Sequence, residues 1–146
     1  MSEIDAADNL SPALTEATRV RLEGVRRGLL HLHKALLDSE RGVYEQNAGR
    51  RVTPGELLQL LIHDTWFAWL RPFSEMVVVI DEMQEAGKKS PGLLTERDVL
   101  EVLGQARLLL EMTENGTGSG GRYFAALQND PATILAYSEV LRYFPE

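Results

Sequence analysis

The chain of 146 residues contains no cysteine. It therefore cannot form disulfides, use a thiolate nucleophile, or bind zinc or an iron–sulfur cluster through cysteine. A chain without disulfides fits the reducing environment of the cytoplasm, so we expect a cytoplasmic protein. Long apolar runs are missing as well. None approaches the roughly 18 residues that a membrane-spanning helix needs, and we expect no membrane partner.

Basic residues are in deficit. Lys and Arg number 15 against 22 for Asp and Glu, which gives a net charge of −7. Nucleic acids bind to net basic faces, so this balance argues against nucleic acid as a partner. The first ten residues, MSEIDAADNL, hold three acidic residues and no basic one, unlike a signal peptide. We expect a flexible acidic tail over residues 1–10 and a single domain over residues 11–146.

Segments that alternate polar and apolar residues, as strands do, are also missing. Apolar residues instead recur three and four positions apart, which predicts amphipathic helices. Thr53, Thr95 and Asp130 each stand where a helix N-cap is expected. The pattern therefore predicts an all-α fold, an irregular bundle of about five helices. The expected helical segments cover residues 12–46, 54–63, 64–86, 96–113, 123–128 and 131–144.

The middle of the chain predicts a kinked central helix. The apolar stripe of residues 57–62 does not continue in phase, so we expect a break at His63, with Asp64 as a new N-cap. Pro72 then falls inside the next segment, where proline removes a backbone donor and bends a helix. Both tryptophans of the chain, Trp66 and Trp69, lie beside this bend.

The stretch NGTGSGGR at residues 115–122 contains the spacing G-x-G-x-x-G, at Gly116, Gly118 and Gly121. In dinucleotide-binding proteins this pattern connects a strand to a helix. Here a helical stripe precedes it, and no second strand follows. We therefore expect no nucleotide at Gly116–Gly121 and a mobile connection over residues 115–121. Weak binding of an anion by the loop amides remains open.

Three polar residues stand seven apart on the first predicted helix: Arg26, His33 and Glu40. His33 lies near the centre of that helix's apolar arc. One interpretation is a pocket in which His33 acts as an acid, base or ligand. The other is structural: a buried hydrogen-bonded trio, or long side chains that extend to solvent. We favour the structural interpretation.

A second group of candidate residues surrounds the predicted bend: His63, Trp66 and Trp69. A kinked aromatic helix can open a cleft, which would be the place to look for a ligand. Alternatively, both tryptophans fill the core, and His63 satisfies a loose backbone group. His31 and His33 face opposite ways, and no metal-binding helix motif is present. We expect no metal, no cofactor and no catalytic residues.

Three stretches resemble a family of small bacterial helical proteins without an assigned activity. They are HKALLDSERGVYE at residues 33–45, TPGELLQLLIHDTWFAWLRPFSE at residues 53–75 and ALQNDPATILAYSEV at residues 126–140. Together with the segments between them, they span most of the chain beyond the tail. The resemblance implies an all-α, bacterial and cytoplasmic protein. It supplies no catalytic or binding residues.

Two functions follow from these observations. The leading hypothesis is a non-enzymatic interaction module of a bacterial cytoplasm, acting with a protein partner or as a homodimer. It rests on the apolar stripe of every predicted helix and on the lack of a recognisable catalytic set. The alternative is a small-molecule-binding or enzymatic bundle with a pocket near His33, Glu40 and Trp66. A cavity of a few hundred Å3 there would favour the alternative, and a filled core would oppose it.

Overall fold

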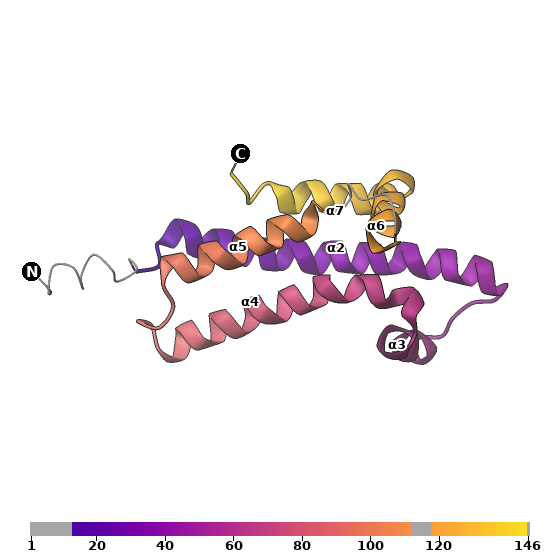
Figure 1. Ribbon diagram of the computed structural model, residues 1–146, viewed down its shortest axis with the longest axis horizontal. Coiled ribbons are helices and arrows are strands. Elements are labelled where there is room, and N and C mark those ends of the chain that lie inside the picture. Colours follow the sequence, from indigo (N-terminus) through magenta and orange to yellow (C-terminus); the bar gives the residue numbers. More distant parts are fainter. Residues whose placement is uncertain (1–12, 112–117, 146) are drawn as a thin grey trace, which may run out of the picture.

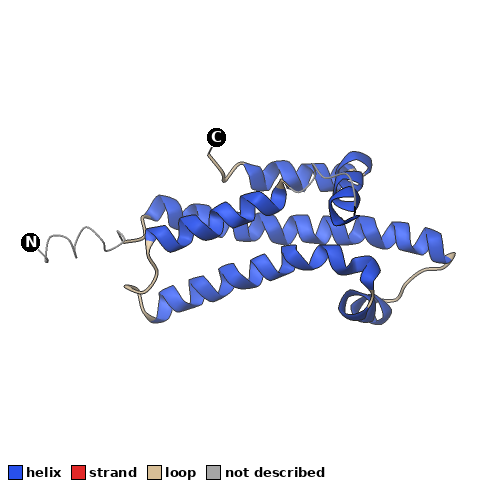
Figure 2. Cartoon of the chain, viewed as in Figure 1, coloured by secondary structure: helices blue, strands red, loops and turns tan. Residues whose placement is uncertain are grey.

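The computed structural model describes residues 13–111 and 118–145, and these residues are almost entirely helical (Figures 1 and 2). An isolated β-bridge joins Ala13 to Thr95, and no strand forms within the described residues. The predicted all-α class is confirmed, whereas the predicted tail lies outside the described residues. The elements are α2 (Glu16–Ala48), α3 (Pro54–His63), the 3-10 helix η1 (Thr65–Leu70), α4 (Arg71–Lys89), α5 (Glu96–Leu110), α6 (Gly118–Asn129) and α7 (Pro131–Leu141).

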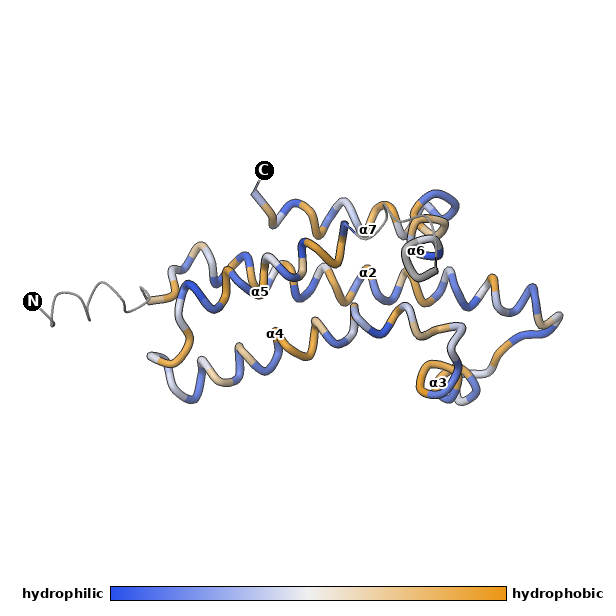
Figure 3. Tube along the Cα trace, in the orientation of Figure 1, coloured by the Kyte–Doolittle hydropathy of each residue, from blue (hydrophilic) through white to orange (hydrophobic). Residues whose placement is uncertain are grey.

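Helix α2 is the axis of the bundle. Its 33 residues span about 50 Å, and α4, α5 and α7 run along it (Figure 1). It begins where the Thr15 side chain accepts a hydrogen bond from the Thr18 amide, and it ends at Gly49, which has a positive φ of 71°. Apolar residues recur along each helix (Figure 3), and those facing inward form one core. The contribution of α2 to this core is Leu22, Val25, Leu29, Leu32 and Leu36.

Two glycines of α2 let α7 and the residues after it pack directly on the α2 backbone. A Cβ atom added to Gly28 would stand 2.7 Å from Cβ of Val140, and one added to Gly24 would overlap the Tyr143 ring. Glycine weakens an isolated helix. At these two positions the cost is offset by van der Waals contacts with Val140 of α7 and with Tyr143, which a side chain on α2 would prevent.

The predicted break after α3 is confirmed. Helix α3 ends at His63, and the Asp64 carboxylate accepts a hydrogen bond of 2.7 Å from the Trp66 amide. The residues that follow form η1, and α4 begins at Arg71. Pro72 therefore occupies the first turn of α4, where its missing amide hydrogen costs no helical hydrogen bond. The expected kink takes the form of a change from 3-10 to α-helix.

The glycine-rich stretch differs from its prediction. Helix α6 begins at Gly118 and not at Tyr123, so the expected loop is wrong for residues 118–121. Gly116 and the rest of residues 112–117 lie outside the described residues. The prediction gave too much weight to the low helix propensity of glycine. Packing of Tyr123, Ala126 and Leu127 in the core stabilises α6 and overrides that propensity.

Among the described residues, each helix is either too short or too polar to cross a lipid bilayer.

Candidate functional site

The three polar residues of α2 do not form a common cluster. Arg26 binds Glu23 through two hydrogen bonds of 2.9 Å and lies 3.5 Å from Asp81 of α4. Gln84 of α4 donates to the same Glu23 carboxylate at 3.0 Å. The Arg26 hydrogen bonds are the main cause that lowers the pKa of Glu23 to about 2. Arg26 therefore belongs to a polar bridge between α2 and α4.

His33 is half-buried, and this burial lowers its pKa. No charged or hydrogen-bonding group of the described residues contributes to that shift. The expected hydrogen-bonded trio is thus not formed, because Arg26 and Glu40 each bind other partners. Among the described residues, no partner acts on His33 that could orient it as a general acid or base.

Glu40 is the most buried acidic residue described, with 6% of its surface exposed. Its carboxylate lies 3.4 Å from the Arg122 guanidinium of α6. Burial raises the pKa of Glu40, and the positive charge of Arg122 opposes this rise. A charged group is retained here in a largely apolar place because it has a partner of opposite sign.

The two tryptophans lie beside the same carboxylate. The indole N–H groups of Trp66 and Trp69 act on Glu40 in the direction of a lower pKa, which favours its ionised form. Both indole nitrogens are buried, and neither reaches hydrogen-bonding geometry with any described residue. Two buried donors therefore point toward one buried acceptor without completing their hydrogen bonds.

Arg122 joins Glu40, Trp66 and Trp69 in one cluster. The sequence did not indicate Arg122 as a site residue. Its guanidinium lies over the Trp66 ring, 4.3 Å from the ring centre, and also donates to the Trp66 carbonyl. The signal was an isolated basic residue between a glycine run and the apolar residues that begin with Tyr123. An isolated arginine does not indicate which residue it will contact, and here the contact is with Glu40, 82 positions away in the sequence.

A cavity of about 240 Å3 opens beside this cluster. Glu40 and Ala126 are buried and form its floor, whereas Val43, Ala125 and Asn129 are exposed and form its mouth. Of the six candidate residues from sequence, Glu40 and Trp66 line the cavity. Its full lining is Ser39, Glu40, Val43, Trp66, Arg122, Ala125, Ala126 and Asn129.

His63 belongs to a different surface. It is exposed and lines an open groove of about 580 Å3 beside α3. The other residues of that groove are Arg50, Gly55, Glu56, Gln59, Leu60 and Asp64. The structure thus separates His63 from the tryptophans, although the sequence places them three and six positions apart.

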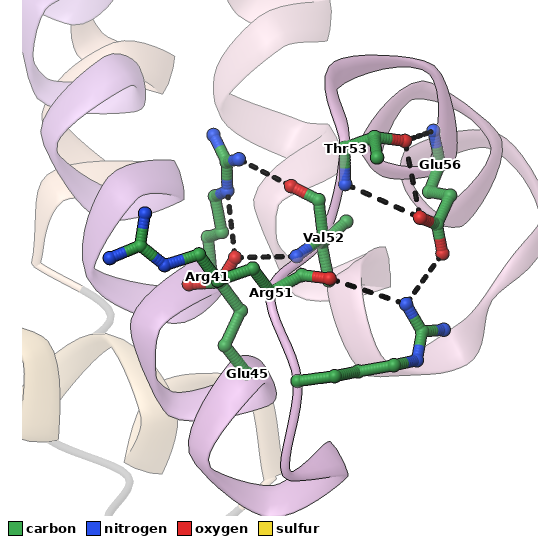
Figure 4. A network of polar contacts seen from close by, with 7 residues as sticks. Arg41, Glu45, Arg51, Val52, Thr53 and Glu56 are labelled. Carbon is green, nitrogen blue, oxygen red and sulfur yellow. Dashed lines mark hydrogen bonds and ion pairs between the residues drawn. The ribbon is translucent and has the colours of Figure 1, made fainter.

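The connection between α2 and α3 is fixed by side chains (Figure 4). The Val52 backbone donates to Glu45 at 2.6 Å and accepts from Arg41. Thr53 is the predicted N-cap of α3, and it forms a capping box with Glu56. This network sets the orientation of α3, whose residues Leu58 and Ile62 point outward, 55% and 53% exposed.

A third groove, of about 550 Å3, lies at the N-terminal end of α2 and is larger than the cavity beside Glu40. Its acidic and basic side chains largely pair with one another, as in Glu23–Arg27 at 3.3 Å and Glu16–Arg19 at 3.8 Å. Elsewhere, no group of three or more His, Asp or Glu in the described part of the chain is placed to hold a metal ion. Of these three cavities, the one beside Glu40 is lined by a buried carboxylate.

The comparisons with known proteins leave the resemblance to a bacterial helical family as a prediction. No family model, no curated protein and no solved structure matches this chain.

Proposed function

We propose that this protein is a small-molecule-binding helical bundle of a bacterial cytoplasm, with its ligand held in the cavity beside Glu40. One observation carries the proposal. A cavity of about 240 Å3 has a buried carboxylate on its floor, and the buried Trp66 and Trp69 N–H groups beside that carboxylate lack a hydrogen-bond partner among the described residues.

Unpartnered buried donors are unfavourable. Each costs roughly 1–3 kcal/mol, and native proteins retain few of them without water or a ligand. Trp66 lines the cavity, so a bound molecule would lie against the residue whose buried N–H is unsatisfied. The surrounding walls are mostly small and apolar, formed by Val43, Ala125 and Ala126. Apolar walls with a few convergent polar groups are typical of ligand sites.

Binding, and not catalysis, is the activity that this geometry supports. Glu40 is the one carboxylate among the described residues that line the cavity, and no histidine accompanies it. Acid–base or nucleophilic mechanisms require a second positioned group. Arg122 is already held by Glu40 and by the Trp66 carbonyl, which suits it to orient a ligand.

The variant Ala125→Leu tests the proposal. Ala125 is exposed at the mouth, so a leucine fills the cavity without disturbing the core. A panel of small water-soluble metabolites is screened by thermal shift against the wild type and this variant. We expect at least one compound to raise the melting temperature of the wild type and to lose this effect in Ala125→Leu. Compounds that stabilise both proteins equally would place the ligand elsewhere.

A second candidate function is the interaction module, and α3 is the observation that favours it. None of its ten residues is fully buried, although five of them are leucine or isoleucine. The net charge of −7 opposes self-association. Helix α3, however, carries a single acidic residue, Glu56, which is paired with Arg50 at 2.7 Å. Two copies could therefore pair through Leu58 and Ile62 without repulsion at the contact.

Light scattering at micromolar concentration tests this second function. A homodimer through α3 should dissociate in the double variant Leu58→Ser, Ile62→Ser. Leu135→Ser is the matched control, because Leu135 of α7 is equally apolar and 64% exposed. A wild type that is monomeric removes the homodimer, and a dimer that survives both sets of substitutions removes α3 as its interface.

A further inference from the structure

The chemistry of the cavity wall restricts the class of ligand that the cavity can take. We propose that the cavity binds a neutral molecule with an amide-like edge, in which a hydrogen-bond donor and an acceptor stand side by side, and that it excludes amines and carboxylates of the same size. This inference rests on the proposed function, since it names the ligand of the same site.

The first argument is charge balance. Among the described residues that line the cavity, the charged ones are Glu40 and Arg122, and they are 3.4 Å apart, so their charges cancel. The Glu40 side chain is only 8% exposed, which removes most of the solvent that would screen an added charge. Because the wall carries no net charge, an ammonium or a carboxylate ligand would lose hydration on entering the cavity without gaining a free charge of opposite sign. A neutral ligand avoids this penalty.

The second argument is the capacity for hydrogen bonds. The Glu40 carboxylate has lone pairs beyond the one used by Arg122, so it can accept from a ligand N–H. Arg122 has five N–H donors, and its hydrogen bonds to described residues all leave from Nη1. An amide edge offers one donor to Glu40 and one acceptor to these N–H groups.

The third argument concerns Trp66. An aromatic face is the usual seat of a cationic ligand in a protein pocket. Here the Arg122 guanidinium already covers the Trp66 ring, at 4.3 Å from its centre. A ligand cation would have to displace a residue that is also bound to Glu40. The arrangement therefore favours a neutral ligand on this side of the cavity too.

Size sets the last limit. The volume of about 240 Å3 is smaller than the roughly 300–1,000 Å3 of sites for drug-sized molecules. Ala125 and Ala126 leave room for a short aliphatic group beside the polar edge. A small aliphatic amide, or the amide end of a longer molecule that leaves through the mouth, fits these limits.

Three probes of nearly equal shape test the proposal: propionamide, propionate and propionamidinium, which are neutral, anionic and cationic. The chain contains two tryptophans, and both lie at the site, so the two indole N–H signals in a 15N-correlated NMR spectrum report binding directly. We expect propionamide to shift the Trp66 signal in a saturable way and to bind at least about tenfold more tightly than either charged probe. We expect no such shift in Ala125→Leu.

The variant Glu40→Gln provides an independent test. It keeps the size of the side chain but leaves Arg122 as the charge at the cavity, so propionate should now bind more tightly than propionamide. Glu139→Gln, an exposed substitution on α7, is the control and should keep the preference of the wild type. A second measurement, the far-ultraviolet circular dichroism of each variant, establishes that it is folded.

The outcomes separate this inference from the proposed function. If a charged probe binds to the wild type most tightly and Ala125→Leu abolishes its binding, the ligand class is wrong and the site stands. If none of the three probes shifts an indole signal while the metabolite panel yields a ligand of the cavity, the amide class is also wrong. If neither the probes nor the panel distinguish the wild type from Ala125→Leu, both proposals fail.

Discussion

The Arg122 guanidinium lies 3.4 Å from the Glu40 carboxylate, and the same guanidinium covers the Trp66 ring. This pair links α6 to α2 and to η1, three elements that are distant in sequence. It also brings the charged residues of the candidate site together at the floor of one cavity. The stability of the fold and the properties of the site should therefore depend on the same contact.

Removing the guanidinium tests this dependence. Arg122→Met should lower the free energy of unfolding by about 2 kcal/mol at pH 7, because it leaves the Glu40 charge buried and unpaired. The loss should be smaller at pH 5 than at pH 7, because burial raises the pKa of Glu40 and protonation removes the charge that Arg122 compensates. Urea denaturation at both pH values measures the effect. Arg97→Met, on the exposed face of α5, is the control, and an equal loss in both variants would contradict the prediction.

The loss of stability at low pH should depend on Glu23. Its pKa of about 2 in the folded protein lies below the ordinary value of 4.5, chiefly because of its hydrogen bonds with Arg26. The stabilisation is therefore complete above pH 4.5 and lost as the pH falls toward 2. Glu23→Gln should remove about 1 kcal/mol of this dependence, a modest amount because the pair is partly exposed. Unfolding by urea between pH 2 and 5 gives the slope.

Glu40 should affect the pH dependence of stability in the opposite direction. Burial raises its pKa in the folded protein above the ordinary value of 4.5, so the folded state holds a proton that the unfolded state has released. Stability from this group is thus present below pH 4.5 and declines as the pH rises through the raised pKa. Glu40→Gln should flatten that decline. A slope unchanged from the wild type, measured by thermal unfolding between pH 4.5 and 7, would rule this out.

The same substitution should have opposite effects at two glycines of α2. Gly28→Ala should destabilise the protein by about 2 kcal/mol, because its Cβ would stand 2.7 Å from Val140 of α7. Gly42→Ala meets nothing within 4 Å and should stabilise the helix by up to about 1 kcal/mol. Chemical denaturation of both variants gives the comparison. Changes of equal sign would show that α7 can move away from α2 at little cost.

The capping box should control α3 locally. Thr53→Ala removes the side chain that accepts from the Glu56 amide, at a cost of about 1 kcal/mol. Because no residue of α3 is fully buried, we expect faster hydrogen exchange of the α3 amides without a change in α2. Thr65→Ala, whose side chain does not cap a helix, is a suitable control. Exchange that accelerates throughout the protein would contradict a local role.

Much of the architecture could be predicted because it depends on local chemistry. Threonine and aspartate caps set the starts of helices, and apolar spacing set the helical class. The break at Asp64 was likewise readable from the phase of two apolar stripes. The start of α6 was not, because its glycines favour a loop and only the packing of Tyr123 and its neighbours makes the helix stable.

The sequence alone determined that this chain is an all-α bundle without cysteine chemistry, since composition and periodicity act residue by residue. It also singled out Glu40, Trp66 and Trp69 as polar or aromatic residues in unusual positions. Tertiary structure decided which of them meet. Arg26 and His33 lie on the same helix as Glu40, but Arg26 binds Glu23 and His33 is half-buried apart from Glu40. Arg122, 82 positions away, pairs with Glu40. Long-range contacts form by packing of whole helices, and spacing along one helix does not encode them.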